Sequence, residues 1–217
     1  MRSLLDHLKS RAAAVVEEVI PKVVKPGDVQ KVLQNLLRER VPVRDLETIM
    51  ETLGDFGGRT NDTDLLTEHV RVALARTICR QHVDESDRLP CLMLEAGLEE
   101  LIAGHVESSG GDGHSINTMP PATAQRIGQE IAQEAAALTR DGRPPVVLCA
   151  PSVRGAVRKL LEPVAPHVAV LSLAEVVGDV TPDVVGVVGD DPGDDGSMDG
   201  PITEDRTVED GYEPANV

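Results

Sequence analysis

The chain has 217 residues, 41% of them apolar, which is enough for a packed core in one or two small domains. Aromatic residues make up only 1% of the sequence, so the core must be built from Leu, Val, Ile and Ala, and aromatic platforms that stack single-stranded bases are disfavoured. The net charge is −16, and an acidic surface without basic stripes repels nucleic acids and anionic membranes.

The acidity is concentrated towards the carboxy terminus. Residues 178–217 contain 12 acidic residues and one basic residue, whereas the first 177 residues contain 25 acidic and 20 basic residues. The segment 190–217 is polar and rich in Asp and Gly, and it cannot bury enough apolar surface to offset the entropy lost on ordering. The sequence therefore predicts a disordered acidic tail over 190–217.

The first part of the chain shows the apolar periodicity of amphipathic helices. Between Asp28 and Glu39 apolar residues recur at i, i+3, i+4 and i+7, as on one face of a helix. A following helix is expected to begin at Pro42 and to end before Gly57. With further helices predicted over 3–19 and 61–80, residues 1–85 are interpreted as a small helical bundle.

After residue 86 the pattern changes to short apolar runs that alternate with helices. Strands are predicted over 89–94, 146–149 and 168–173, with a possible edge strand over 184–188. Helices are predicted near Leu98–Ile102, from Pro120 onwards and over 152–162, and a Gly-rich loop follows residue 106. Strand, helix and strand in succession favour parallel pairing through a right-handed crossover, so residues 86–189 are predicted to form a small α/β subdomain with a short sheet.

Common catalytic and metal-binding patterns are missing from the sequence. The turn CAPSVRG at 149–155 lacks the glycines that bring backbone amides against phosphate, and Ser152 lies outside a Gly-x-Ser-x-Gly elbow and is expected to cap a helix. The spacing of the cysteines and histidines matches no zinc ribbon or finger, so core cysteines are expected at Cys79 and Cys91. No catalytic, cofactor-binding or metal-binding residue is predicted.

The amino-terminal segment mixes charged with apolar residues and contains no continuous apolar run of the kind that a signal peptide or a membrane span requires. The cysteines at 79, 91 and 149 are scattered, which does not suggest a disulfide framework. Together these observations predict a reduced, cytoplasmic environment and no membrane insertion by this chain.

Arg154, Arg158 and Lys159 form a basic cluster along the helix predicted over 152–162. Two interpretations are open, a partner-docking patch and an ordinary solvated helix face. Because the chain is acidic overall, neither interpretation includes contacts with a phosphate backbone.

Two segments of the sequence are distinctive. One is VQKVLQNLLRERVPVRDLETIMETL at Val29–Leu53, and the other is PVVLCAPSVRGAVRKLLEPVAPHVAVLSLAEV at Pro145–Val176, which contains a Leu-Ser-x-x-Glu element. Both segments resemble the FlhA (FHIPEP) family of flagellar and virulence type III export gates. The resemblance extends over roughly residues 3–189 and is to the family's carboxy-terminal cytoplasmic part. Full family members carry a membrane domain and two cytoplasmic subdomains before this part, so a fragment, a truncated product and a separate paralogue are all open interpretations.

The resemblance implies a cytoplasmic docking platform, assembled as a homo-oligomeric ring, that receives export substrates and their chaperones beside other export apparatus proteins. It implies no enzymatic chemistry. The residues expected to make protein contacts are Arg44, Asp45, Glu47, Glu51, Arg154 and Arg158, although Asp45 is equally suited to capping its helix. The alternatives are a stand-alone soluble regulator of the export machinery that acts through its acidic tail, and a small α/β enzyme that uses Ser152 or the cysteines.

Overall fold

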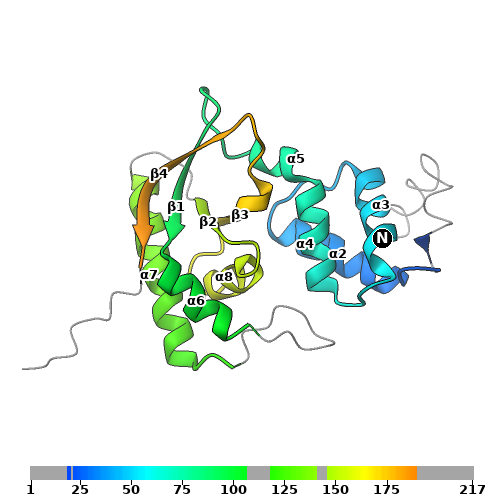
Figure 1. Cartoon of the computed structure of the whole chain (residues 1–217), viewed down its shortest axis with the longest axis horizontal. Helices are drawn as coiled ribbons and strands as arrows, with labels where there is room; N and C mark the ends of the chain where they lie inside the picture. The colour runs from blue at the N-terminus through cyan, green and yellow to red at the C-terminus, as the bar shows by residue number, and fades with distance from the viewer. Residues whose placement is uncertain (1–18, 21, 107–117, 141–145, 190–217) are drawn as a thin grey trace, which may run out of the picture.

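The computed structural model describes residues 19–20, 22–106, 118–140 and 146–189. The helix predicted over 3–19, most of the Gly-rich loop and the acidic tail lie outside the described residues, apart from Val19 and Thr118 at their edges. Within the described part, a helical unit (α2–α5) lies at one end of the molecule and a sheet with α6–α8 lies at the other (Figure 1). The fold class predicted from the sequence is confirmed.

Helix α2 spans Pro26–Arg38, and the apolar positions of its stripe are buried: Val29, Val32, Leu33 and Leu36. The helix ends in a Schellman motif, in which the Val41 amide donates to the Leu36 carbonyl at 2.9 Å and the Arg40 amide donates to the Leu37 carbonyl at 3.0 Å. Arg40 takes the left-handed conformation of this motif with φ 59°, a position where glycine is the usual residue.

Helix α3 spans Leu46–Gly57, so the predicted start at Pro42 is wrong by one turn. Asp45 sets the observed start, because its carboxylate accepts a hydrogen bond from the Thr48 amide at 3.2 Å and one from the Thr48 hydroxyl at 2.8 Å. The chain between Val41 and Asp45 has no regular secondary structure, and Pro42 belongs to this connection.

The helix predicted over 61–80 is divided in the structure. Helix α4 spans Thr63–Ala73 with Asp62 as its N-cap, and the short helix α5 spans Ala75–Cys79. The two meet at Leu74, which is buried and has φ −91° and ψ 10°. Since no Gly or Pro lies at this point, the break follows from tertiary packing and carries no local sequence signal.

The sheet contains β1 (Arg88–Leu94), β2 (Val146–Cys149), β3 (Ala169–Ser172) and β4 (Thr181–Val188) in the order β3-β2-β1-β4, and every neighbouring pair is parallel. β4 is an edge strand, as the sequence predicts. The pairing of β1 with β4 contains an irregularity, because Cys91 pairs with Val184 but Leu92 pairs with Gly186.

The two faces of the sheet belong to different cores. Because side chains alternate along a strand, Val146 and Leu148 of β2 pack with the apolar residues of the helical unit. Val147 and Cys149 pack on the other face with α6 (Ala96–Gly104), α7 (Pro121–Arg140) and α8 (Arg154–Leu161). The division predicted at residue 85 falls in the turn before β1, and the core of the helical unit continues across it onto the sheet.

Helices α7 and α8 approach each other closely at Gly128. A Cβ atom at this position would lie 2.7 Å from the backbone carbonyl oxygen of Leu160. Glycine is required here by the contact between the two helices, because a backbone atom cannot move aside as the end of a flexible side chain can.

Candidate functional site

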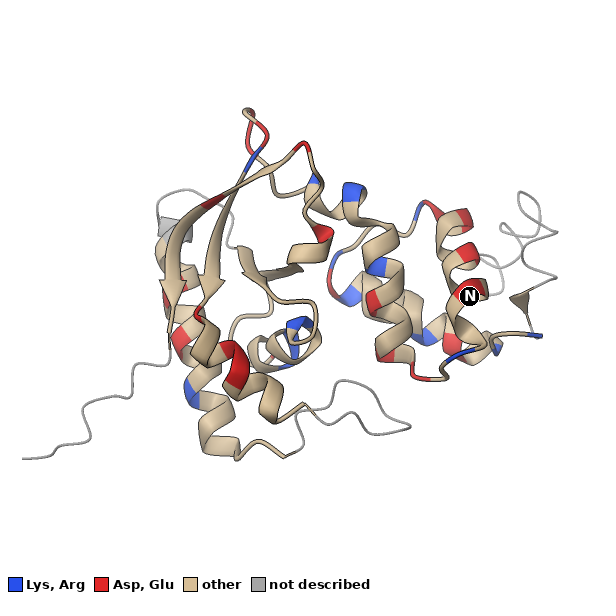
Figure 2. Ribbon diagram, viewed as in Figure 1, with Lys and Arg blue, Asp and Glu red and all other residues tan. Residues whose placement is uncertain are grey.

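The predicted contact residues Arg44, Asp45, Glu47 and Glu51 are all exposed at the start and along one side of α3. Asp55 is also exposed, so the acidic residues Glu47, Glu51 and Asp55 recur at i, i+4 and i+8 on one side of this helix. Figure 2 shows the acidic residues of α3 in red. Asp45 caps α3, which confirms the capping role expected of it. We call Arg44, Asp45, Glu47, Glu51 and Asp55 the α3 surface.

Arg154 and Arg158 do not form an exposed patch. Arg154 is 2% exposed and Arg158 is 7% exposed, so the interpretations as a docking patch and as a solvated face are both wrong for these residues. The reason is that the side of α8 that carries them faces the helical unit and the strand β3. Arg158 donates to the carbonyls of Val168 at 3.0 Å and Pro166 at 3.3 Å.

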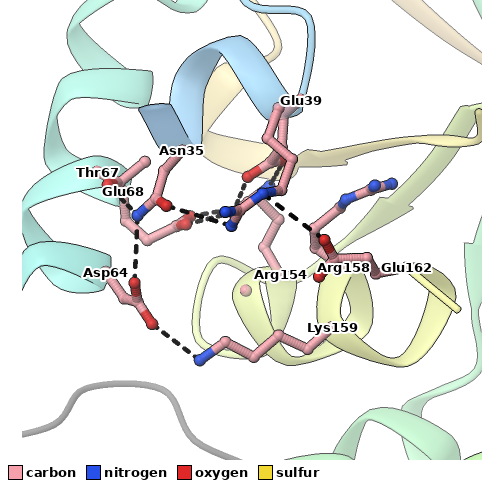
Figure 3. Close-up of a pocket in the computed structure, with 11 residues that line it drawn as sticks. Asn35, Glu39, Asp64, Thr67, Glu68, Arg154, Arg158, Lys159 and Glu162 are labelled. Atoms are coloured by element: carbon pink, nitrogen blue, oxygen red, sulfur yellow. Dashed lines mark hydrogen bonds and ion pairs between the residues drawn. The ribbon is translucent and has the colours of Figure 1, made fainter. Parts of the chain in front are cut away.

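Arg154 links α8 to two helices of the helical unit (Figure 3). Its guanidinium pairs with Glu39 at 2.6 Å, where the chain leaves α2, and with Glu68 on α4. Arg71 on α4 pairs with the same Glu39 at 3.0 Å and with Glu175 at 2.8 Å. We call these five residues the junction network, since it joins α2 and α4 to α8 and to the segment after β3.

The charges of the junction network stabilise one another. Burial raises the pKa of Glu39, but the adjacent Arg154 and Arg71 outweigh this effect and hold its pKa below the ordinary value. Burial lowers the pKa of Arg154, and Glu68 and Glu39 more than reverse that effect. Buried groups that are charged and paired in this way are expensive to separate, so the network favours one relative position of α8 and the helical unit.

Two further contacts hold the same junction. Lys159 donates to Asp64 on α4 at 2.9 Å, and Asn35 on α2 donates to Asp64 and to Thr67, each at 3.2 Å (Figure 3). Burial raises the pKa of Asp64, but the hydrogen bond and charge of Lys159 lower it below the ordinary value. These contacts are partly exposed and contribute less than the buried pairs.

The Leu-Ser-x-x-Glu element has a structural role. Ser172 and Glu175 form a capping box around the short 3-10 helix η1 (Leu173–Glu175), in which Glu175 accepts from the Ser172 amide at 2.6 Å and from its hydroxyl at 3.0 Å. Glu175 is fully buried and also pairs with Arg71. The element therefore ends β3 and places a carboxylate in the junction network.

The residues considered for an enzymatic role are Ser152 and the three cysteines. The three cysteines are buried, and burial raises the pKa of Cys91 to about 11 and raises that of Cys149 further. Ser152 is exposed but does not cap α8, whose N-cap is Val153, so that prediction is wrong. Among the described residues no group of His, Cys, Asp and Glu is placed to hold a metal ion.

None of the described helices is long and apolar enough to cross a membrane.

The sequence and the fold are both similar to those of type III export proteins. The model of the FHIPEP family matches residues 1–181. The flagellar biosynthesis protein FlhA of Bacillus subtilis is 38% identical over 86% of this chain and 27% of its own length, and FlhA of Salmonella typhimurium is 34% identical over 81% of this chain and 24% of its own length. The chain thus spans about a quarter of the length of these relatives.

Among solved structures, the Chlamydia pneumoniae CdsV protein matches with a TM-score of 0.75 and 27% identity, covering 86% of this chain and 53% of CdsV. The nonameric SctV-C of enteropathogenic Escherichia coli (EPEC) matches with a TM-score of 0.68 and 27% identity, covering 86% of this chain and 55% of that protein. The chain belongs to the FHIPEP family.

Proposed function

We propose that this chain acts in a flagellar or related type III export gate, as a docking and ring-forming platform on the cytoplasmic side of the membrane. The observation that carries the proposal is the family match over residues 1–181 together with a fold shared with CdsV over 86% of the chain. The partners proposed are other export apparatus proteins, export substrates and their chaperones. The proposal includes no cofactor.

The proposal of ring assembly is supported by relatives that are described as nonamers. SctV-C is described as nonameric, and so is the EscV cytosolic domain, which matches with a TM-score of 0.65 and 28% identity. The relative CdsV is also described in a complex with the CdsO protein. For this chain we propose the same two kinds of contact, between copies of itself and with other proteins of the export apparatus.

The α3 surface is the proposed contact region. Its acidic side chains repeat on the exposed side of α3 and contribute nothing to the core. Like charges four residues apart slightly destabilise a helix, so the fold itself does not require them. Such a stripe is complementary to a basic surface on a neighbouring copy or on another protein. Arg44, beside the first turn of α3, adds one positive charge that a matching acidic group would recognise.

Replacing Arg44 with glutamate is expected to weaken assembly without changing the fold. Like charges placed opposite each other at an interface cost several kcal/mol, so association should weaken by roughly tenfold or more. The measurement is the export of a reporter substrate together with cross-linking of neighbouring copies, in cells that carry the substitution.

Lys31→Glu is the matched control, because Lys31 is exposed on α2 and lies outside the α3 surface. It should leave both export and cross-linking at the level of the unsubstituted protein. Normal export and cross-linking in the Arg44→Glu strain would remove the α3 surface from the proposal.

A further inference from the structure

A cavity of about 150 Å³ lies beside the junction network, between the helical unit and the sheet. Its walls come from the end of α2, from α4 and α5 with the turn after them, from α8, and from residues 166–171 that lead into β3. One water molecule requires only about 10–15 Å³ measured in this way, so the cavity has room for a polar ligand larger than water.

The charges that line the cavity are unusual for an acidic chain. Its arginines are Arg38, Arg40, Arg71 and Arg158, whereas Glu39 is the one carboxylate among the described residues that line it. Glu39 is already occupied by Arg71 and by Arg154 of the junction network. Arg38 and Arg71 also pair with carboxylates outside the lining, Glu162 and Glu175, so the excess positive charge of the lining comes from Arg40 and Arg158.

Two of the arginines are exposed and two are buried. Arg38 and Arg40, at the end of α2, are exposed, and we call their side of the cavity its mouth; Arg71 and Arg158 are buried, and we call their side its floor. Arg40 is fixed at the mouth by the Schellman motif, which holds its backbone at φ 59°. A left-handed conformation at a residue other than glycine costs free energy, and such positions cluster at functional sites.

Each buried arginine has one donor without an acceptor in the described part of the chain. The Nη atoms of Arg71 are used by Glu39, by the Val170 carbonyl and by Glu175. The Nη atoms of Arg158 are used by two backbone carbonyls, whereas the Nε atoms of both arginines are buried and have no hydrogen-bond partner among the described residues. Buried donors are nearly always satisfied in folded proteins, so the walls of the cavity are short of acceptors.

The electrostatic surroundings favour an acceptor with negative charge. Burial lowers the pKa of Arg158, and the neighbouring Arg154 and Arg71 lower it further, against the effects of Glu39 and Glu162. Burial and the charge of Arg71 also lower the pKa of His82, which lines the same cavity. An anion between these groups would relieve the repulsion among the arginines.

We propose that this cavity binds a small free oxyanion of the phosphate or sulfate class. The planar guanidinium fork matches the oxygen spacing of such anions, and the anion would bring negative charge to a lining that contains four arginines. Because the lining comes from both the helical unit and the sheet, the bound anion would stabilise the junction between them. The proposal concerns ligand binding by the folded chain and does not depend on the role in export.

The experiment titrates the full chain with inorganic phosphate and with sulfate, and it follows heat release by calorimetry and unfolding by thermal melting. Potassium chloride at the same ionic strength is the reference, because it screens charges without supplying an oxyanion. Saturable phosphate or sulfate binding that raises the melting temperature above the chloride reference is expected. Adenosine monophosphate is expected to bind no more tightly than phosphate, since no Phe, Tyr or Trp among the described residues of the lining offers a face for the base to stack on.

Two variants locate the site. Arg158→Gln removes a floor charge and should weaken phosphate binding at least tenfold, as the loss of one charge-assisted hydrogen bond implies. Arg40→Glu reverses a charge at the exposed mouth and should also weaken binding about tenfold, with the melting temperature in chloride little changed. Arg44→Glu is the matched control, because it reverses an exposed arginine outside the cavity, and it should bind phosphate normally.

The proposal is overturned if phosphate and sulfate have no effect beyond that of chloride, or if Arg40→Glu binds phosphate as tightly as Arg44→Glu does. Tighter binding of adenosine monophosphate than of phosphate would also overturn it, because the site would then belong to a larger ligand. If Arg158→Gln fails to fold, as judged by its circular dichroism, the comparison of Arg40→Glu with Arg44→Glu decides alone.

Discussion

Replacing Arg154 with methionine is expected to lower the free energy of unfolding by roughly 3–5 kcal/mol. Arg154 is 2% exposed and pairs with Glu39 and Glu68, so methionine keeps most of the packing but leaves two carboxylates without their main partner. Removing one member of a buried ion pair costs more than the pair itself contributes, because the remaining charge stays away from water. Urea denaturation followed by circular dichroism measures this loss.

Arg38→Met is the control for Arg154→Met. The ion pair of Arg38 with Glu162 has a distance of 3.7 Å and side-chain exposures of 59% and 49%, so its loss should change stability by less than about 1 kcal/mol. Adding Glu39→Gln and Glu68→Gln to Arg154→Met should recover part of the loss, because the carboxylates are then neutral. Equal stability of the Arg154→Met and Arg38→Met proteins would show that the junction network does not hold the two units together.

Replacing Leu148 with alanine is expected to lower the free energy of unfolding by about 2–5 kcal/mol while unfolding remains a single transition. Leu148 lies on β2, which has a strand on either side, and its side chain is fully buried against the core of the helical unit. The cavity left by alanine is thus shared by the sheet and the helical unit. Because the helical unit and this face of the sheet share one core, both should lose structure together, as thermal melting followed by circular dichroism and by hydrogen exchange would record.

The same substitution at an exposed leucine separates burial from the change of residue. Leu37 on α2 is 56% exposed, so Leu37→Ala should cost well under 1 kcal/mol. If Leu148→Ala splits unfolding into two transitions, with the helical unit melting at its original temperature, the two units have separate cores.

The sequence was most informative where a local pattern determined the element. The stripe between Asp28 and Glu39 predicted α2, and the short apolar runs predicted the strands, because burial imposes the same periodicity in any context. It failed at Leu74, where tertiary packing decides and the sequence has no signal. It also failed at the start of α3, where two local signals compete and capping by Asp45 prevails over Pro42.

The junction network was harder to predict, because its residues come from distant parts of the chain. The sequence shows Arg154 and Arg158 as a basic cluster, but it does not show which side of a helix faces a partner element. Arg71 carries a weak signal, since it lies four residues after the buried Thr67 and beside the buried Val70, on the apolar side of α4. A charged residue at such a position indicates a buried carboxylate partner.

The contact role of the α3 surface remains a prediction, and the exposure of its residues is compatible with it. Exposure of Arg44, Glu47 and Glu51 is necessary for a contact role, and Asp45 is accounted for by capping. What distinguishes contact residues from ordinary solvated ones is a partner, which a single chain does not contain.

The most direct test of the proposed role in export replaces the matching segment of Bacillus subtilis FlhA, which is 38% identical, with this chain. Export of flagellin and swimming motility are then measured in a strain that lacks its own FlhA. The account predicts that the chimera restores export, and that the same chimera with Arg154→Met does not. A chimera that accumulates normally, yet exports no flagellin, would contradict it.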